Sequence, residues 1–246
     1  MSYYAPDAPP EWSAATAFSH ESRGPNHAND HDDDRWRRVC RGRVCEGVVA
    51  GASPMTAVAT NRCDWASTPE MARYHDEEWG VPLRDDNALF EFLVLEGAQA
   101  GLSWATVLKK REAYREAFHG FEIARVARMA DRDVERLLGD ARLIRNRGKI
   151  TSALGNAKVA LQLQKEHGSL AAYLWSFVGG EPIVRVLRSM KEVPAQTAES
   201  EAMSKALKKA GMRFVGPTIM YAFMQATGMV NDHLVTCPRR AELLAS

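Results

Sequence analysis

From residue 61 onward, one pattern recurs along the sequence: a helix-capping residue, a segment with helical periodicity, and then a glycine or a short connection. Ser67 or Thr68 can cap a helix whose first residue is Pro69, a position that proline favours. The alternation of apolar and polar residues that is typical of a strand occurs almost only in "PIVRVL", residues 182–187. The pattern therefore predicts an all-α domain with short loops.

We expect about eight helices, because eight segments carry these start and stop signals. One of them is expected to run without a break from Ser103 to Gly120, and the longest to cover residues 146–167. The expected ranges are 67–79, 86–101, 103–120, 131–140, 146–167, 169–180, 199–211 and 217–228. No internal repeat is visible.

Residues 1–60 differ from the remainder, because they are rich in Pro, Gly, Asn and Asp and show no sustained periodicity. We expect a poorly ordered extension there, followed by one domain over residues 61–246. The folded pattern begins close to Met55, which is a candidate for the true start. In the extension, the thiols of Cys40 and Cys45 are preceded by the imidazoles of His27 and His31. They could bind a metal ion, but the composition favours incidental thiols on a flexible segment.

The composition is that of a soluble protein: 46% of the 246 residues are hydrophobic and 26% are charged. There is neither an apolar run of 18 residues nor a signal-peptide pattern, so we expect a cytoplasmic protein without a membrane contact. Four cysteines are too few for a disulfide scaffold. The net charge of +1 gives no nucleic-acid signature. Residues 1–60 hold 6 Lys and Arg against 8 Asp and Glu, and the remainder holds 26 against 23, which merely permits binding to a polyanion.

Two short stretches carry residues with metal-binding chemistry. In "NDHLVTC", His233 and Cys237 stand four positions apart, so that a helical turn would bring imidazole and thiol to one face. This spacing alone favours a plain buried thiol beside a surface histidine. Upstream, "RCDW" supplies Cys63 and "YHDEEWG" supplies His75. Together the four residues have the composition of a closed, structural Cys2His2 zinc site.

Several longer strings identify a family. The sequence resembles the DNA-3-methyladenine glycosylase I (Tag) family in "RCDW", "YHDEEWG", "LEGAQAGLSW", "VLKKRE", "RNRGKI", "LWSFV" and "SKALKKAGMRFVGPTIMYAFMQATGMVNDH". The resemblance covers residues 61–237, and the strings stand in the same order as in the family, with compatible spacing. It implies an all-α fold of the helix-hairpin-helix glycosylase superfamily. It also implies one structural Zn²⁺ per chain, with Cys63, His75, His233 and Cys237 as its ligands.

The resemblance implies an activity and a substrate as well. The family hydrolyses the N-glycosidic bond of 3-methyladenine in alkylated double-stranded DNA, as a step of base excision repair. Its members usually act as monomers. Methylation at N3 makes the base cationic, so it departs as a neutral molecule and needs little catalytic assistance. Such an enzyme must extrude the nucleotide from the stack and recognise the base in a pocket.

Glu96 is the candidate catalytic residue. On a helix it shares a face with Leu89, Leu93 and Ala100, so its carboxylate is buried unless a cleft opens there. From the residues alone, a structural glutamate paired with an arginine is equally consistent with this position. The resemblance implies the functional alternative, in which Glu96 hydrogen-bonds the excised base. An ionised Glu96 would favour a cationic base over a neutral one.

Three aromatic residues are candidates for the wall of the base pocket. Tyr74 adjoins His75, and Trp104 follows Glu96 by eight positions. Any one of these aromatics is more often a core residue, but a ring face also attracts a cationic base. The resemblance implies that Tyr74 and Trp104 line the pocket, with Trp79 nearby. The sequence departs from the family at Met71, a position often occupied by tyrosine. A thioether cannot donate a hydrogen bond, so the polar contacts of this part of the pocket wall differ from those of the family.

The candidate DNA contacts lie in "DARLIRNRGKITSAL", residues 140–154, between two expected helices. Backbone amides at the start of the second helix, together with Arg145, Arg147 and Lys149, could hold a phosphate. A solvated basic loop is the alternative, because the Gly-rich hairpin sequence of the superfamily is not literal here. The connection "AQAGLSW" is a further candidate, which could meet the gap left by the extruded base.

Two other functions compete with this interpretation. One is a glycosylase of the same fold that activates water with an aspartate, but "NRGKITSALGNAKVALQLQKE" contains no Asp. The other is a zinc-stabilised helical DNA-binding module without catalysis. Tyr74, Glu96 and Trp104 argue against this module, because a protein that only binds DNA needs no buried carboxylate.

Overall fold

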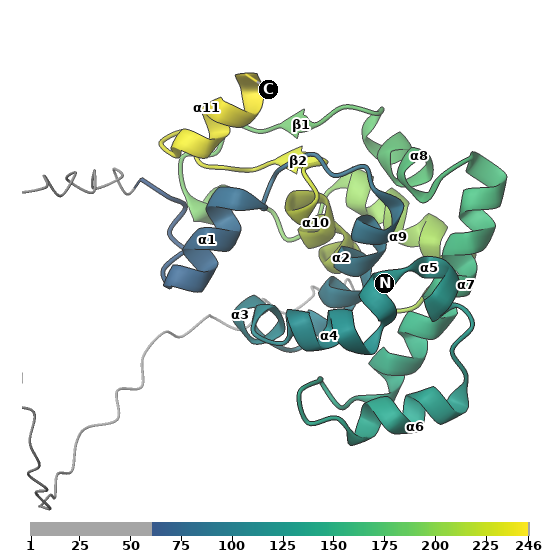
Figure 1. Cartoon of the computed structure of the whole chain (residues 1–246). Helices are drawn as coiled ribbons and strands as arrows, with labels where there is room; N and C mark the ends of the chain where they lie inside the picture. The colour runs from purple at the N-terminus through teal and green to yellow at the C-terminus, as the bar shows by residue number, and fades with distance from the viewer. Residues whose placement is uncertain (1–60, 246) are drawn as a thin grey trace, which may run out of the picture. The chain divides into compact units, whose positions relative to one another are not determined.

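The computed structural model describes residues 61–245 (Figure 1). The extension expected over residues 1–60, together with Cys40, Cys45 and the candidate start at Met55, lies outside the described residues.

The described part of the chain is mainly helical, as the sequence predicts. Its α-helices are α1 Pro69–Glu77, α2 Asp86–Gln99, α3 Trp104–Leu108, α4 Arg111–Ala117, α5 Ile123–Val126, α6 Asp131–Gly139, α7 Arg147–His167, α8 Leu170–Trp175, α9 Ala198–Lys209, α10 Pro217–Ala226 and α11 Pro238–Ala245. Short 3-10 helices cover His119–Phe121, Ser176–Val178 and Met190–Glu192. In residues 61–245 no helix combines the length and the apolar composition that crossing a membrane requires.

The helix starts follow the capping chemistry visible in the sequence. The Thr68 hydroxyl accepts a hydrogen bond from the Met71 amide at 3.3 Å, and Pro69 begins α1. Asp85 caps α2 by accepting from the Ala88 amide at 2.9 Å. Asn146 caps α7 by accepting from the Lys149 amide at 3.0 Å. These side chains satisfy backbone donors that the first turn of a helix leaves free.

The prediction of one continuous helix over residues 103–120 is wrong. The chain turns at Lys109 and Lys110, which separates α3 from α4. The Lys110 ammonium donates to the carbonyls of Ala141 and Arg142, at 3.3 and 2.8 Å, so the turn is held by the segment that precedes α7. Local periodicity could not reveal this break, because its partners lie about thirty residues away along the chain.

Two further helices were not predicted. The helix α5 has four residues, too few to display a periodic pattern, and α11 follows immediately after Cys237.

The expected strand segment is confirmed only in part. β1 Ile183–Val184 pairs in parallel with β2 Val230–Asn231, with Ile183 opposite Val230 and Val184 opposite Asn231. Both strands are only two residues long. A strand as short as β2 cannot show the alternation of apolar and polar residues by which a strand is predicted from sequence. The ladder fixes the chain directly before Asp232 and His233.

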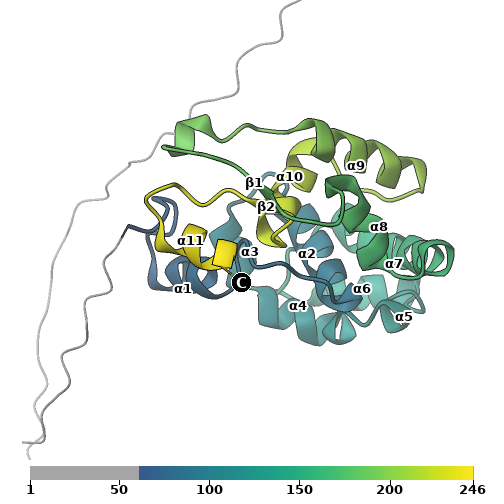
Figure 2. The same ribbon diagram turned by 90° about the horizontal axis from the view of Figure 1, so that it is seen from above.

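Helix α2 is the central element of the domain. Its residues from Leu89 to Ala98 are all buried, and it packs against α10, α7, α8 and α3. Figures 1 and 2 show this helix surrounded by the others, with α11 beside α1. The burial of α2 extends to its C-terminal part, so the carboxylate of Glu96 lies in the interior.

Candidate functional site

Four predicted metal ligands converge from segments far apart in the sequence. Cys63 precedes α1, His75 lies within α1, His233 follows β2, and Cys237 precedes α11. One ligand atom from each lies within 4.8 Å of those of the others, and all four residues are buried. We call Cys63, His75, His233 and Cys237 the metal cluster.

The spacing of these atoms fits a tetrahedral ion. The Cys237 sulfur lies 3.5 Å from His75 Nε2 and 3.6 Å from His233 Nδ1. The Cys63 sulfur lies 3.9 Å from His233 Nδ1. Tetrahedral bonds of about 2.0 Å to nitrogen and 2.3 Å to sulfur place neighbouring ligand atoms roughly 3.3–3.8 Å apart. The cluster therefore needs little adjustment to hold zinc.

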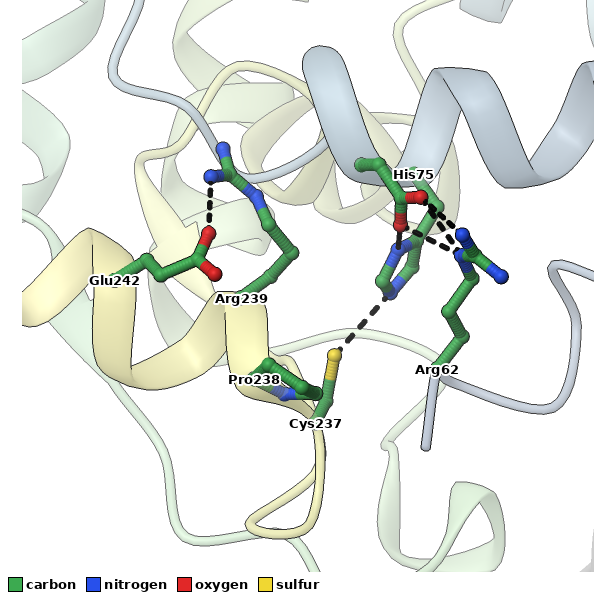
Figure 3. Close-up of a pocket in the computed structure, with 7 residues that line it drawn as sticks. Arg62, His75, Cys237, Pro238, Arg239 and Glu242 are labelled. Atoms are coloured by element: carbon green, nitrogen blue, oxygen red, sulfur yellow. Dashed lines mark hydrogen bonds and ion pairs between the residues drawn. The ribbon is translucent and has the colours of Figure 1, made fainter. Parts of the chain in front are cut away.

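Neighbouring groups orient both imidazoles toward the centre of the cluster. His75 Nδ1 lies 2.8 Å from an Asp76 oxygen, and Arg62 in turn binds Asp76 at 2.6 Å. Figure 3 shows the His75 ring between this ion pair and the Cys237 sulfur. His233 Nε2 donates to the Trp79 carbonyl at 3.1 Å, which leaves Nδ1 for the ion. Such partners fix which ring nitrogen can ligate.

The protonation of the metal cluster reflects its burial. Burial raises the pKa of the Cys63 thiol to about 12. Burial, followed by the neighbouring His75, lowers the pKa of His233 to about 4. Neutral imidazole is the form that ligates a metal, and a divalent cation supplies the charge that a buried thiolate requires. This donor set therefore favours a cation at its centre.

Two tryptophans pack against the metal cluster. The Trp79 ring lies 4.5 Å from the His233 ring centroid and stacks on His75 at 5.9 Å. Trp65 lies 5.3 Å from His75 and 5.0 Å from Trp79. The structure thus places Trp79 beside the metal ligands, and its part in a base pocket stays a prediction.

A second group of predicted residues lies where α1, α2 and α3 meet. The rings of Tyr74 and Trp104 are 5.3 Å apart, and Phe92 stacks on Trp104 at 6.4 Å. Burial raises the pKa of Tyr74, and the charge of Glu96 adds to the rise. Glu96 lies one helical turn after Phe92 on α2. We call Tyr74, Glu96 and Trp104 the pocket cluster.

Glu96 has no ion-pair partner among residues 61–245. Glu96 is only 4% exposed, and its Oε2 accepts no hydrogen bond from the described residues. Burial raises its pKa to about 8. The buried Arg111 pairs with Glu78 at 2.6 Å and with Glu91. Among residues 61–245, the structure therefore shows no arginine paired with Glu96, which is what the structural alternative requires.

Trp104 adds a second buried polar atom without a partner in the described part of the chain, its indole Nε1. The pocket cluster thus combines a carboxylate oxygen and an N–H, both unsatisfied, with aromatic rings. Buried polar groups usually have hydrogen-bond partners, so two such atoms in one cluster indicate a ligand that supplies them.

The three predicted DNA contacts differ in their surroundings. Arg145 lies in the connection between α6 and α7, whereas Arg147 and Lys149 lie in the first turn of α7. Arg145 is exposed and forms no ion pair within residues 61–245. Arg147 forms an exposed two-point ion pair with Glu135, at 2.6 and 2.9 Å. The half-buried Lys149 donates its ammonium to two carbonyls at the end of α2, so its charge is bound within the domain.

Sequence reasoning missed two supporting groups of the site. Asp76 directly follows His75, and this adjacency is a usable signal for an outer partner of a metal ligand. The network of Arg111, Glu78 and Glu91 has no such signal, because Arg111 and Glu78 are 33 positions apart.

A family model described as methyladenine glycosylase matches residues 65–240. The chain belongs to this family. Among methyladenine glycosylases it is 53% identical over 177 residues to DNA-3-methyladenine glycosylase 1 of Escherichia coli (strain K12), covering 72% of this chain and 95% of that protein. It is 47% identical over 180 residues to DNA-3-methyladenine glycosylase of Haemophilus influenzae (strain ATCC 51907 / DSM 11121 / KW20 / Rd), covering 73% and 97%.

A solved structure shares the fold as well. That of 3-methyladenine DNA glycosylase I from Staphylococcus aureus, described as the structural basis of 3-methyladenine recognition, has a TM-score of 0.72 at 37% identity. The match covers 74% of this chain and 97% of that one. The predicted fold class, a helical glycosylase domain of this family, is confirmed.

Proposed function

We propose that the protein is a DNA-3-methyladenine glycosylase I, which extrudes 3-methyladenine from alkylated DNA and hydrolyses its N-glycosidic bond in base excision repair. Family membership and the relatives support this activity. The structural observation that supports it most is Glu96, a buried carboxylate without an ion-pair partner among residues 61–245, whose charge helps to raise the pKa of Tyr74. The Tyr74 ring in turn lies 5.3 Å from the Trp104 ring.

The pocket cluster suits a cationic purine. Glu96 accepts a hydrogen bond from the exocyclic amino group, and its ionised form balances the positive charge of the base. Trp104 and Tyr74 offer ring surfaces that attract a cation by stacking and by cation–π interaction. Because 3-methyladenine leaves as a neutral base, binding and orientation supply most of the catalysis. Trp79 packs on the metal ligands His75 and His233, and a part in this wall is a prediction from the family resemblance alone.

Cys63, His75, His233 and Cys237 would hold one Zn²⁺ per chain. When bound, this ion supplies structural cross-linking alone, because four protein ligands leave no position for a reacting molecule. The chain's own residues determine what is cross-linked. His75 follows Tyr74 directly, so the metal cluster ties the pocket end of α1 to the segment around β2 and α11.

Two surface features supply the expected contacts with double-stranded DNA. Arg145 lies at the turn before α7, where an unpaired cation can meet a phosphate. In the connection between α2 and α3, Gly101 has φ +77° and Leu102 is 40% exposed. An exposed apolar side chain at this connection can fill the gap that the extruded base leaves. We expect a monomer to suffice, because the pocket cluster and these contacts come from one chain.

The decisive experiment incubates the protein with methylated duplex DNA and identifies the released bases by chromatography. We expect 3-methyladenine in the soluble fraction, and a Glu96→Ala variant that releases much less. A zinc-stabilised binding module would bind the DNA and release nothing. A glycosylase with another specificity would release a neutral or oxidised base instead.

A further inference from the structure

Arg111 is a buried cation at the start of α4, and it pairs with carboxylates on two other helices. Its Nη1 donates to Glu78 Oε2 at 2.6 Å, and its Nε donates to Glu91 Oε1 at 2.5 Å. Glu78 is the C-cap of α1, and Glu91 lies within α2. Arg111 and Glu91 are each only 7% exposed. One guanidinium therefore joins α1, α2 and α4.

The same guanidinium also lies over an aromatic ring that supports the pocket cluster. Its central carbon is 5.0 Å from the ring centroid of Phe92, which is a cation–π geometry. Phe92 in turn lies nearly parallel to Trp104, with 16° between the ring planes and 6.4 Å between the centroids. The Trp104 ring lies 5.3 Å from that of Tyr74. A continuous series of contacts therefore leads from Arg111 to two members of the pocket cluster.

A second route leads from Arg111 to Tyr74 through the end of α1. The backbone amide of Glu78 donates to the Tyr74 carbonyl at 3.0 Å, so the residue that pairs with Arg111 closes the helical turn that begins at Tyr74. Burial raises the pKa of Tyr74 most, followed by the charge of Glu96. The charge of Glu78 adds to this rise, whereas that of Arg111 opposes it. Both partners of the ion pair therefore act on the phenol.

The chemistry of arginine suits a junction of this kind. The guanidinium is planar, carries several donors in a rigid fork and offers a flat face to an aromatic ring. It can therefore bind two carboxylates and cover Phe92 at the same time. A buried ion network often adds little net stability, because desolvation offsets the attraction between its charges. What the contacts of Arg111 add is a fixed spacing between the helices that they join.

We propose that Arg111 is a positioning residue for the base pocket, which sets the separation of the Tyr74 and Trp104 rings through its contacts with Glu78 and Phe92. A purine is captured only where the ring surfaces are held at the right spacing, and a misplacement of about 1 Å can lower the rate about 100-fold. Arg111 contacts neither the base nor the DNA in this arrangement. The inference rests on the proposed glycosylase function.

Arg115 provides the matched control, because it lies one turn later on α4 and also pairs with Glu91, at 2.9 Å. Its ion pairs within residues 61–245 are with Glu91 and Glu112, so none of them joins α4 to α1. Arg111→Met and Arg115→Met therefore both remove a cation from Glu91. Only Arg111→Met also releases Glu78 and removes the guanidinium from the Phe92 ring.

Calorimetry with free 3-methyladenine measures the pocket without DNA. We expect Arg111→Met to weaken binding by about 10-fold, because the base loses part of its stacking surface. Arg115→Met should bind within about twofold of the wild type, since a partly exposed ion pair contributes little. Arg111→Lys keeps a cation for one glutamate and should restore part of the affinity. Equal weakening in the two methionine variants would overturn the proposal, as would wild-type binding by a folded Arg111→Met variant.

Crystal structures of the variants give a measurement that does not depend on activity. The distance between the Tyr74 and Trp104 ring centroids should depart from 5.3 Å in Arg111→Met and remain unchanged in Arg115→Met. An unchanged distance in Arg111→Met would overturn the proposal. Melting curves establish that each variant is folded, and Arg111→Lys takes the place of Arg111→Met if the latter does not fold. If the wild type neither binds nor releases 3-methyladenine, the proposed function fails, whereas the ring separation still tests the role of Arg111.

Discussion

Replacing Glu96 with glutamine keeps the shape of the side chain and removes its charge. Burial raises the pKa of Glu96 to about 8, from 4.5 for an exposed carboxyl group. Below pH 4.5 the group is protonated in the folded and the unfolded chain, so it does not affect the free energy of unfolding. Between pH 4.5 and about pH 8 the unfolded chain loses the proton while the folded chain keeps it. The free energy of unfolding therefore falls by about 1.4 kcal/mol for each pH unit in this range.

At pH 7 this cost reaches about 3 kcal/mol, since pH 7 lies about 2.5 units above the unfolded value. Glu96→Gln avoids the cost because the amide does not ionise. We therefore expect the variant to be more stable than the wild type at pH 7, by up to about 3 kcal/mol, and to match it near pH 4. An ion-paired glutamate would give the opposite result, a loss of stability in the variant.

The effect on activity has the opposite sign. An ionised Glu96 stabilises the cationic base, so Glu96→Gln should lower single-turnover release of 3-methyladenine by about 10-fold or more, or about 1.4 kcal/mol. In the wild type, kcat/KM should rise with pH and level off above about pH 8, because it reports the ionisation of the free enzyme. The variant should lack this rise.

The assay combines release of 3-methyladenine from methylated duplex DNA, corrected for spontaneous loss, with melting curves at pH 4 and pH 7. Glu96→Asp serves as the control that keeps the charge. Wild-type release from a folded Glu96→Gln variant would remove Glu96 from the mechanism. A large drop in its melting temperature at pH 7 would refute the assignment of an unpaired buried carboxylate.

Three further predictions follow from the two clusters and the domain boundary. Metal analysis of the freshly purified, reduced protein should find one zinc per chain. His233→Ala should lose this zinc and melt roughly 10 °C or more lower than the wild type. Replacement of Cys40 and Cys45 should change neither the zinc content nor the melting temperature. Trp104→Ala should weaken binding of free 3-methyladenine by about 10-fold or more in calorimetry, because stacking contributes about 1–3 kcal/mol per base. A chain beginning at Met55 should fold and release base at a rate similar to that of the full chain, and a large loss of activity in a folded truncated chain would assign the extension a part in DNA binding.

The local parts of the fold were predictable from the sequence because their causes are local. Thr68 and Asn146 each satisfy an amide within the first turn of the helix that they precede, and a capping residue shows this without knowledge of the fold. The metal ligands were also predicted, but only because Cys63 and His75 completed a Cys2His2 set, since the spacing of His233 and Cys237 alone favoured a plain buried thiol. Their convergence rested on the family resemblance, because His75 and Cys237 are 162 positions apart.

The remaining features depend on packing between distant segments. The turn after α3 is held by a hydrogen bond from Lys110 to the Arg142 carbonyl. The end of α2 is held by a hydrogen bond from Lys149 to the Ala98 carbonyl, 51 positions away. Basic residues in a polar segment have the same sequence pattern whether they face solvent or another helix. Lys149 was therefore predicted as a phosphate contact. Its hydrogen bonds to the carbonyls of α2 can be seen only in the folded structure.

The burial of Glu96 also accounts for selectivity between charged and neutral bases. Ionising this carboxyl group at pH 7 costs about 1.4 kcal/mol, because its pKa is about 8. A unit positive charge about 4 Å away returns about 4 kcal/mol at an effective dielectric constant of about 20. Arg111 does not supply that charge, because Glu78 and Glu91 already neutralise it. A cationic base therefore gains about 3 kcal/mol over a neutral one of the same shape, which corresponds to a preference of roughly a hundredfold. An exposed or arginine-paired glutamate would lose most of this difference, so Glu96 discriminates because it is buried and has no ion-pair partner among residues 61–245.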